Sequence, residues 1–294
     1  MTPRTGIGRL RRHAWVLALG VAACSDKDPS GPPAGDAGFS ITVRYIGVTT
    51  PSQRNAVERA VARWSAAIVK DIPDVPLTIA ADACLDGQPA VQETVDDLLL
   101  FVHFASFDGP GGAIAQAGPC FVRSGSQLPL VGVLMVDRDD MSTLTRNGLL
   151  EDVMLHELGH VLGIGTVWTG LRLLSGAGGD DPQFTGAYAS AVYHELAGLS
   201  GSVPVENTGG PGTRDGHWRE SVFGNELMTG TLDFGGNPLS ALSIQSLRDL
   251  GYATTTTPAS GYTLPVAAAR IEVEPGETLA LHAHEVLIQP RFSR

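Results

Sequence analysis

Several signatures of common protein classes are absent from this chain of 294 residues. It contains no phosphate-binding loop of the Gly-Lys-Ser/Thr kind, no dinucleotide-binding glycine fingerprint and no internal repeat. Beyond residue 23 it has no apolar run long enough to span a membrane as a helix. These absences argue against a nucleotide-dependent enzyme, a repeat protein and a membrane protein with several spans.

Positive charge is also scarce. Lys and Arg number 20 against 31 Asp and Glu, which gives a net charge of −11, and there is no basic patch. Loss of the first 23 residues would remove four arginines and no acid, leaving 16 basic and 31 acidic residues and a charge of −15. Such a chain repels nucleic acid and anionic lipid surfaces, so we expect no nucleic-acid partner. Because 43% of the residues are hydrophobic, the chain can bury a full core.

The N-terminus has the pattern of a secretory signal. Four arginines precede an apolar run at Ala14–Ala23, which is too short for a permanent membrane helix. The end of this run, Val21–Cys24, resembles a bacterial lipobox, in which cleavage leaves Cys24 as a lipidated first residue. We therefore expect a signal peptide at residues 1–23 and a lipidated tether, rich in Pro and Gly, at residues 24–38. The alternative is an ordinary signal in which Cys24 is incidental.

The residue after Cys24 bears on where such an anchor would lie. Several acyl chains hold a protein on a membrane stably. Ser25 occupies the position at which Asp would favour retention in the inner membrane. The predicted location is therefore extracytoplasmic, as a bacterial lipoprotein of the outer membrane or the cell surface.

The segment His156–His160 reads His-Glu-Leu-Gly-His and has the spacing of a metal site. On a helix, two histidines four residues apart lie on one face and can bind the same zinc ion, while Glu157 stands beside them. Zinc lowers the pKa of a bound water, and a neighbouring carboxylate can take the proton as that water attacks a carbonyl. The apolar residues of Leu149–Leu162 fit a buried helix, and Gly163 predicts a sharp turn after it. The alternative is a core helix with two structural histidines.

A catalytic zinc ion usually has three protein ligands, so a third is expected elsewhere in the chain. His217 is the best candidate, because it follows a Gly-rich loop and stands 11 residues before Met228. His103 lies within the apolar run Leu98–Phe104 and is interpreted as a core residue. The remaining histidines, in the signal segment, on a predicted helix at Ala187–Ala197 and in the C-terminal tail, are His13, His194, His282 and His284.

Taken together, these residues resemble the leishmanolysin family of metzincin zinc peptidases. The resemblance rests on the segment His156–Gly163, a long insertion, His217 with Trp218, and a Met-containing turn at Glu226–Gly230. It covers roughly residues 39–252. It departs from some other metzincins at Gly230, where a tyrosine can assist the transition state, so no side chain is assigned to that task.

The resemblance also implies roles for particular residues. His156, His160 and His217 would bind one zinc ion, and Glu157 would act as the general base. Met228 would form the hydrophobic floor beneath the metal, in a Met-turn; an ordinary core methionine is a compatible interpretation.

The implied fold is α+β, with a twisted mixed sheet and the active-site helix in an N-terminal subdomain and an irregular C-terminal subdomain that carries the Met-turn. The sequence itself supports the first part. Phe39–Ile46 alternates as a half-buried strand does, and Thr50–Gln53 has the capping box and early proline of a helix that should run to about Ile68. Leu98–Phe104 and Val131–Val136 are apolar runs typical of interior strands.

The Gly-rich segment Phe107–Pro119 resembles the stretch that leads into the substrate-aligning edge strand of metzincins. An edge strand beside an active site can take up a peptide as one more strand, so that main-chain hydrogen bonds orient the scissile bond. The alternative is a plain Gly-rich turn. Asp108 in this segment is a weak candidate for a calcium ligand.

The region after the metal helix is less regular. Within a catalytic domain at residues 39–253, residues 170–216 form an insertion between the second and third expected zinc ligands, and a connection of this length usually serves as a lid or binding loop. Asp180 and Asp181 in the insertion are interpreted as solvated acids, with calcium binding as the alternative. The segment Ser240–Leu250 has the pattern of a helix, which is expected to close the domain under the Met-turn. Residues 254–294 are expected to form a short β-like or partly disordered tail, with strand-like stretches at 270–273 and 278–282.

Two cysteines remain once Cys24 is lipidated. In an oxidising compartment a disulfide between Cys84 and Cys120 is plausible. The alternative is that one thiol occupies the zinc site as a latency switch, but no propeptide of useful length follows the signal.

The sequence thus predicts a membrane-anchored zinc endopeptidase that acts on protein or peptide substrates, with its oligomeric state open. Two other functions are considered. The first is a surface-binding adhesin that retains the zinc site without catalysis, and the second is a zinc hydrolase that acts on cell-wall amides.

Overall fold

The computed structural model describes residues 1, 38–198, 200–265, 278–281, 285–288 and 290–292. The predicted signal peptide, Cys24 and nearly all of the tether therefore lie outside the described residues, as do His13, His282, His284 and the strand-like stretch 270–273. Within the described residues, no helix is long and apolar enough to cross a membrane.

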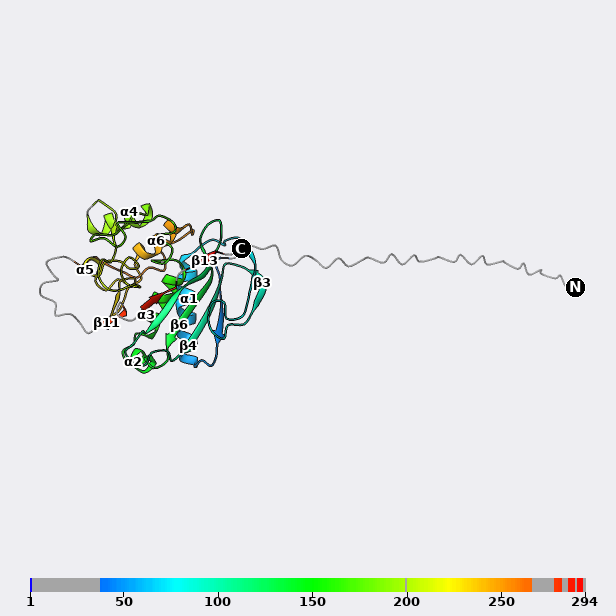
Figure 1. The fold of residues 1–294 in the computed structure, drawn as a ribbon. Helices are drawn as coiled ribbons and strands as arrows, with labels where there is room; N and C mark the ends of the chain where they lie inside the picture. Colours follow the sequence, from blue (N-terminus) through cyan, green and yellow to red (C-terminus); the bar gives the residue numbers. More distant parts are fainter. Residues whose placement is uncertain (2–37, 199, 266–277, 282–284, 289, 293–294) are drawn as a thin grey trace. The chain divides into compact units, whose positions relative to one another are not determined.

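The fold is α+β and is organised around a twisted, mixed sheet (Figure 1). Its strands lie in the order β1, β4, β6, β5 and β12, and β13 also pairs with β5. Strands β1, β4 and β6 are parallel, and β5 is antiparallel to β6. The bounds are Ile41–Ile46 (β1), Leu98–Ala105 (β4), Ala115–Val122 (β5), Pro129–Asp137 (β6), Glu285–Leu287 (β12) and Arg291–Phe292 (β13).

The interior strands β4 and β6 follow from continuous apolar runs, because both faces of these strands are covered. Leu99–Ala105 lies opposite Val131–Asp137, and nearly all of these residues are buried. The predicted strands at residues 98–104 and 131–136 are thus confirmed.

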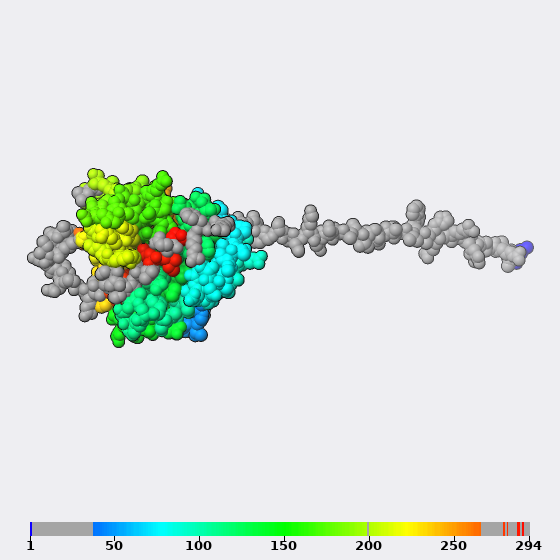
Figure 2. All heavy atoms as spheres, in the orientation of Figure 1, coloured from blue at the N-terminus to red at the C-terminus, as the bar shows by residue number. Residues whose placement is uncertain are grey.

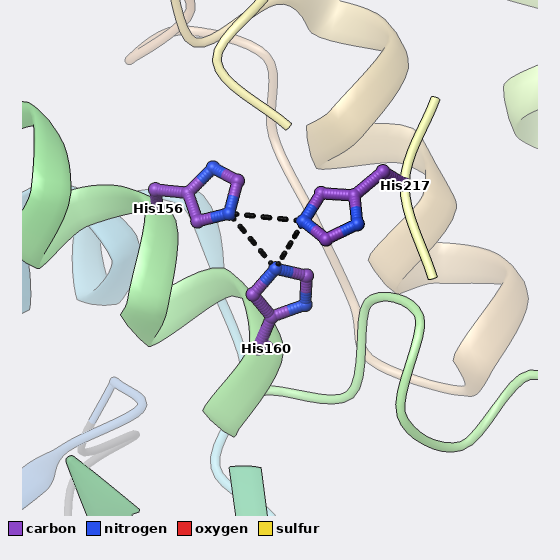
Figure 3. A group of neighbouring side chains, drawn as sticks. All are labelled: His156, His160 and His217. Atoms are coloured by element: carbon purple, nitrogen blue, oxygen red, sulfur yellow. Dashed lines mark hydrogen bonds between the residues drawn. The ribbon is translucent and has the colours of Figure 1, made fainter. Parts of the chain in front are cut away.

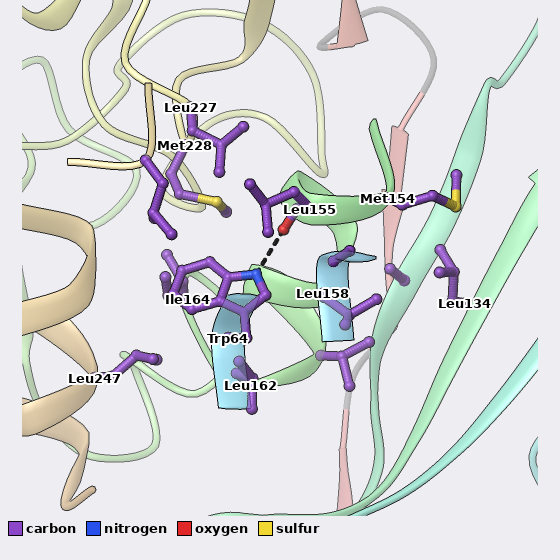
Figure 4. Close-up of a cluster of buried hydrophobic side chains, with 14 of the residues drawn as sticks. Trp64, Leu134, Met154, Leu155, Leu158, Leu162, Ile164, Leu227, Met228 and Leu247 are labelled. Carbon is purple, nitrogen blue, oxygen red and sulfur yellow. Dashed lines mark hydrogen bonds between the residues drawn. The ribbon is translucent and has the colours of Figure 1, made fainter. Parts of the chain in front are cut away.

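Helix α1 (Pro51–Ala67) begins as its sequence predicts. The hydroxyl of Thr50 accepts a hydrogen bond from the N–H of Gln53, and the Gln53 side chain accepts one from the N–H of Thr50. The buried face of α1 packs on helix α3 (Leu150–Val161), where the Trp64 indole N–H donates to the carbonyl of Leu155 at 2.8 Å. Helix α3 in turn packs on β5 and β6 (Figure 4).

After α3 the chain forms short elements, and helices α4 and α6 pack on each other (Figure 1). The predicted helices at 187–197 and 240–250 are confirmed, the second with Ser240 as its N-cap. The bounds here are Leu174–Ser175 (β7), Gln183–Phe184 (β8), Ala187–Ala197 (α4), Val203–Pro204 (β9), Glu220–Phe223 (α5), Thr231–Asp233 (β10), Ala241–Leu250 (α6) and Thr278–Ala280 (β11). Strands β7, β8 and β9 give the insertion a small sheet of its own, and β11 pairs with β10.

Two features were not predicted from the sequence. A hairpin of β2 (Val75–Ile79) and β3 (Val91–Val95) covers one face of the sheet, and the short helix α2 (Met141–Arg146) precedes α3. A further difference concerns β5, which was expected to offer a free edge. In the structure that edge pairs with β12 and β13 from the C-terminal segment, because their backbones supply the hydrogen-bond partners that β6 supplies on the other side.

Cys84 and Cys120 form a disulfide that joins the loop after β2 to β5, with a Cα–Cα distance of 5.7 Å and a sequence separation of 36. A cross-link of this span lowers the conformational entropy of the unfolded chain, which stabilises the folded state by about 3 to 4 kcal/mol. We expect replacement of both cysteines by serine to lower the free energy of unfolding by roughly 2–4 kcal/mol in urea denaturation. Reductant should destabilise the unmodified protein to a similar extent and leave the double variant unchanged; equal stability of the two proteins would contradict the prediction.

Candidate metal centre

Helix α3 brings two histidines to one place. His156 and His160 are one helical turn apart, and both are completely buried. The helix ends where Gly163 adopts φ +114°, a conformation that favours glycine, and a Cβ at this position would lie 2.8 Å from the Val167 side chain. The turn lets the Ile164 carbonyl accept a hydrogen bond from Nδ1 of His160 at 2.9 Å.

The third histidine arrives from the far end of the insertion. His217 is completely buried, and its carbonyl accepts a hydrogen bond from the N–H of Glu206 at 2.9 Å. The N–H of the next residue, Trp218, donates to the carbonyl of Met228 at 3.0 Å. His217 is therefore held between the insertion on one side and the predicted Met-turn on the other.

The three imidazoles converge on one point (Figure 3). Their Nε2 atoms lie 2.9, 3.0 and 3.2 Å apart. Each Nδ1 is paired with a main-chain carbonyl: Leu227 for His156 at 2.7 Å, Ile164 for His160 at 2.9 Å and Thr213 for His217 at 3.0 Å. This pairing places the proton on Nδ1 and leaves a lone pair on each Nε2.

This arrangement fits a zinc ion. Three nitrogens at a zinc–nitrogen distance of about 2.0–2.1 Å in a tetrahedral site are roughly 3.3 Å apart, close to the spacing of the three Nε2 atoms. Three buried lone pairs at such short range repel one another unless a cation lies between them. Neutral imidazoles oriented by Nδ1–H bonds to carbonyls are also the form in which histidine ligates zinc.

Glu157 lies on α3 between the two histidines of the motif and is completely buried. Met228 lies beside this helix, next to Leu227 (Figure 4). A Cβ at Gly159 would lie 2.6 Å from the Met228 sulfur, so the glycine of the motif permits this close contact.

A buried carboxylate organises the turn around Met228. One oxygen of Glu226 accepts hydrogen bonds from the hydroxyls of Ser240 and Ser243 at 2.6 and 2.7 Å. Its other oxygen accepts one from the N–H of Met228 at 2.6 Å. The Ser243 hydroxyl also accepts the indole N–H of Trp218 at 2.8 Å. Desolvation raises the pKa of Glu226, and these hydrogen bonds oppose that shift.

Sequence reasoning did not identify Glu226 as important, although it lies within the predicted turn. An acidic residue two positions before the methionine is the only local signal. Its partners lie 14 and 17 residues further along the chain, at the start of α6.

The other histidines considered as ligands are not part of this centre. His103 lies on β4, where burial lowers the pKa of its side chain. His194 is exposed on α4, and its Nε2 is 2.7 Å from the carbonyl of Gly201. Because Cys84 and Cys120 are bonded to each other, neither thiol acts as a latency switch.

Two of the acids considered for calcium are engaged in local contacts. A carboxylate oxygen of Asp108 accepts a hydrogen bond from the N–H of Ala113 at 2.6 Å. Asp181 forms an ion pair with Arg219 at 2.7 Å. Among the described residues, groups of three or more close metal-ligand side chains occur at the three histidines and at a partly exposed cluster of Asp71, Asp96 and Asp97.

A cavity of about 520 Å³ is lined by residues that lie close in sequence to the metal centre. The loop after His160 contributes Gly165 and Thr166, and the residues just before His217 contribute Asp215 and Gly216. Part of its wall comes from the C-terminal segment, through Leu287 and Pro290. The space therefore lies between the two chain segments that carry the second and third histidines.

We expect Glu226→Ala to destabilise the protein by on the order of 3 kcal/mol, because it leaves the Met228 N–H and two serine hydroxyls buried without their acceptor. The same change should weaken zinc binding by roughly tenfold or more, since the Leu227 carbonyl that orients His156 belongs to this turn. Urea denaturation and zinc titration against a competing chelator measure the two effects. The exposed Glu195→Ala on α4 is the control, and zinc affinity equal to that of the control would contradict the proposed positioning role.

A second carboxylate, Glu220, predicts a pH dependence of stability. Burial raises its pKa from 4.5 to about 7, so the folded protein holds a proton that the unfolded chain releases near pH 4.5. This contribution to stability is full below pH 4.5 and is lost as the pH rises through 7. Glu220→Gln should therefore be more stable than the unmodified protein at pH 8, by about 1 kcal/mol after allowance for solvent screening, with little difference at pH 4.5. Thermal unfolding of both proteins at several pH values checks this, and parallel profiles would refute it.

Comparison with known proteins identifies the family of this chain. The family model described as leishmanolysin, peptidase family M8, matches residues 78–260, more than half of the chain, and this range contains the three histidines, Glu157 and Met228. A leishmanolysin homolog of Crithidia fasciculata is 30% identical in a match of 167 residues that covers 53% of this chain and 24% of the relative. The match therefore spans about a quarter of that relative's length. The chain therefore belongs to the leishmanolysin family.

Proposed function

We propose that this protein is a zinc-dependent endopeptidase that hydrolyses peptide bonds of extracytoplasmic proteins. The observation that carries the proposal is the convergence of three buried Nε2 atoms within 3.2 Å of one another, each on a ring oriented by a main-chain carbonyl. Two of these histidines lie on a helix that also bears Glu157. When bound by His156, His160 and His217, zinc would supply a Lewis acid and lower the pKa of a water molecule.

Glu157 would then act as the general base. Its carboxylate takes a proton from the attacking water and passes it to the amine that leaves when the peptide bond breaks. A carboxylate one residue from a metal ligand on the same helix is suitably placed for both transfers.

The finer metzincin architecture is part of the same proposal. The sheet, α1 and α3 would form one subdomain, which supplies two of the ligands, and the short elements from Ile164 to the end of α6 would form the other. Met228 would be the floor of the site in a Met-turn, which is supported by its contact with Gly159 and by the hydrogen bond between its carbonyl and Trp218.

We also propose that the protein acts outside the cytoplasm as a lipoprotein of the outer membrane or cell surface, anchored through Cys24. The apolar run and lipobox at the N-terminus support this proposal. The disulfide between Cys84 and Cys120 is consistent with it, because such bonds persist in oxidising compartments.

The function is tested with the zinc-loaded protein and an unfolded substrate such as casein. Glu157→Ala should lower kcat by about 10²–10⁴-fold while the protein still binds one zinc ion per chain, because this variant removes the base and keeps the ligands. A chelator should abolish activity of the unmodified protein, and added zinc should restore it.

The ligand assignment is tested by zinc stoichiometry in His217→Ala, with His194→Ala as the matched control on the exposed face of α4. The first variant should lose zinc and activity, and the second should keep both. Cleavage of cell-wall amides in place of casein would favour the amide hydrolase, and zinc binding without either activity would favour a surface-binding role.

A further inference from the structure

The outer edge of β5 is covered by the chain's own C-terminal segment. Glu285–Leu287 pairs in parallel with Ala115–Ala117, and Arg291–Phe292 pairs with Phe121–Val122. Between these two stretches the N–H of Ile288 donates to the carbonyl of Ala117 at 2.9 Å. The segment therefore uses the main-chain groups of β5 that an added peptide strand would use.

This edge lies beside the metal centre. Helix α3, which carries two of the three histidines, packs directly on β5. Leu287 and Pro290 line the cavity that also includes Thr166, which hydrogen-bonds to the carbonyl of His160, and Gly216, which precedes His217. Figure 2 shows the red C-terminal strands between the yellow part of the chain and the cyan to green strands of the sheet.

Two glycines allow the segment to lie this close. A Cβ at Gly216 would be 2.7 Å from a methyl carbon of Leu287, and one at Gly118 would be 2.7 Å from the carbonyl oxygen of Ile288. The segment thus contacts both the strand and the loop that leads to the third histidine.

The three histidines and Glu157 are each 0% exposed with the segment in this position. An endopeptidase must admit an extended chain to its metal, so this arrangement is closed to substrate. The pairing is also short, because it consists of three and two residues separated by Pro290, which has no N–H to donate. A competing strand has only a few hydrogen bonds to replace.

We propose that the two described stretches of the C-terminal segment, Glu285–Ile288 and Pro290–Phe292, act as an intramolecular inhibitor. They occupy the peptide-binding edge of β5 and must withdraw before substrate binds. This inference rests on the proposed function, since it assigns the regulation of the same site. The inhibitor is competitive, because it takes the place of a substrate strand and leaves the histidines and Glu157 unchanged.

The first test compares the zinc-loaded full chain with a chain that ends at Leu281, which keeps β11 and the buried Leu281. A tethered competitor acts at an effective concentration of about a millimolar. The shortened chain should therefore cleave a peptide substrate with a KM lower by roughly tenfold or more and an unchanged kcat. Equal KM values, or loss of activity in a folded, zinc-bound shortened chain, would overturn the proposal.

A point variant in the full chain gives the same test without deletion. Leu287→Asp places a charge in the contact with Gly216 and should lower KM, whereas Val48→Asp, at a residue that is 85% exposed, should not. If the shortened chain fails to fold, the comparison of Leu287→Asp with Val48→Asp is the test of the proposal. An unchanged KM in Leu287→Asp would then overturn the inhibitor role.

A binding measurement separates this inference from the proposed function. A fluorescent peptide with the sequence of residues 282–294 should bind the shortened chain carrying Glu157→Ala and should not bind the full chain with the same substitution. Binding to the shortened chain but not to the full chain supports the inference, even if no variant cleaves protein. In that case only the proposed function fails. Absence of binding to the shortened chain, or equal binding to both chains, contradicts the inference.

Discussion

The metal centre depends on the orientation of three imidazole rings by main-chain carbonyls. Each Nδ1–H donates to a carbonyl from a different loop, so the direction of every Nε2 lone pair is set by the main chain. The carbonyl for His160 comes from the turn after Gly163, and the carbonyl for His156 comes from Leu227. The site is therefore only as well ordered as these loops.

Glu226 explains how one of those loops keeps its shape. Its carboxylate joins the turn at Met228 to the first turn of α6, and Ser243 extends the connection to Trp218 beside His217. One buried acidic group thus links two segments that carry metal-orienting contacts. A buried carboxylate is costly unless its oxygens accept hydrogen bonds, and here both oxygens do.

The sequence predicts the local parts of this fold well. Helix α1 shows a capping box and α6 a serine cap, and β4 and β6 are marked by unbroken apolar runs, because these signals act within a few residues. The motif on α3 and the choice of His217 also depend on spacing. Strands of two or three residues such as β7 and β12 carry too little pattern, since they form only where a partner strand is already in place. The partners of Glu226 and of β5 are distant in sequence, and composition does not reveal them.

The distance along the chain between His160 and His217 has a consequence for folding. The first two histidines are positioned by one helix, whereas the third depends on a segment of 56 residues that has closed on itself through β7, β8 and β9. A metal ion held by all three would close that loop, and its binding energy would be available only once the loop has formed. The ion would in this way act as a cross-link, and its release would first loosen the insertion, while the sheet with α1 and its disulfide would remain intact.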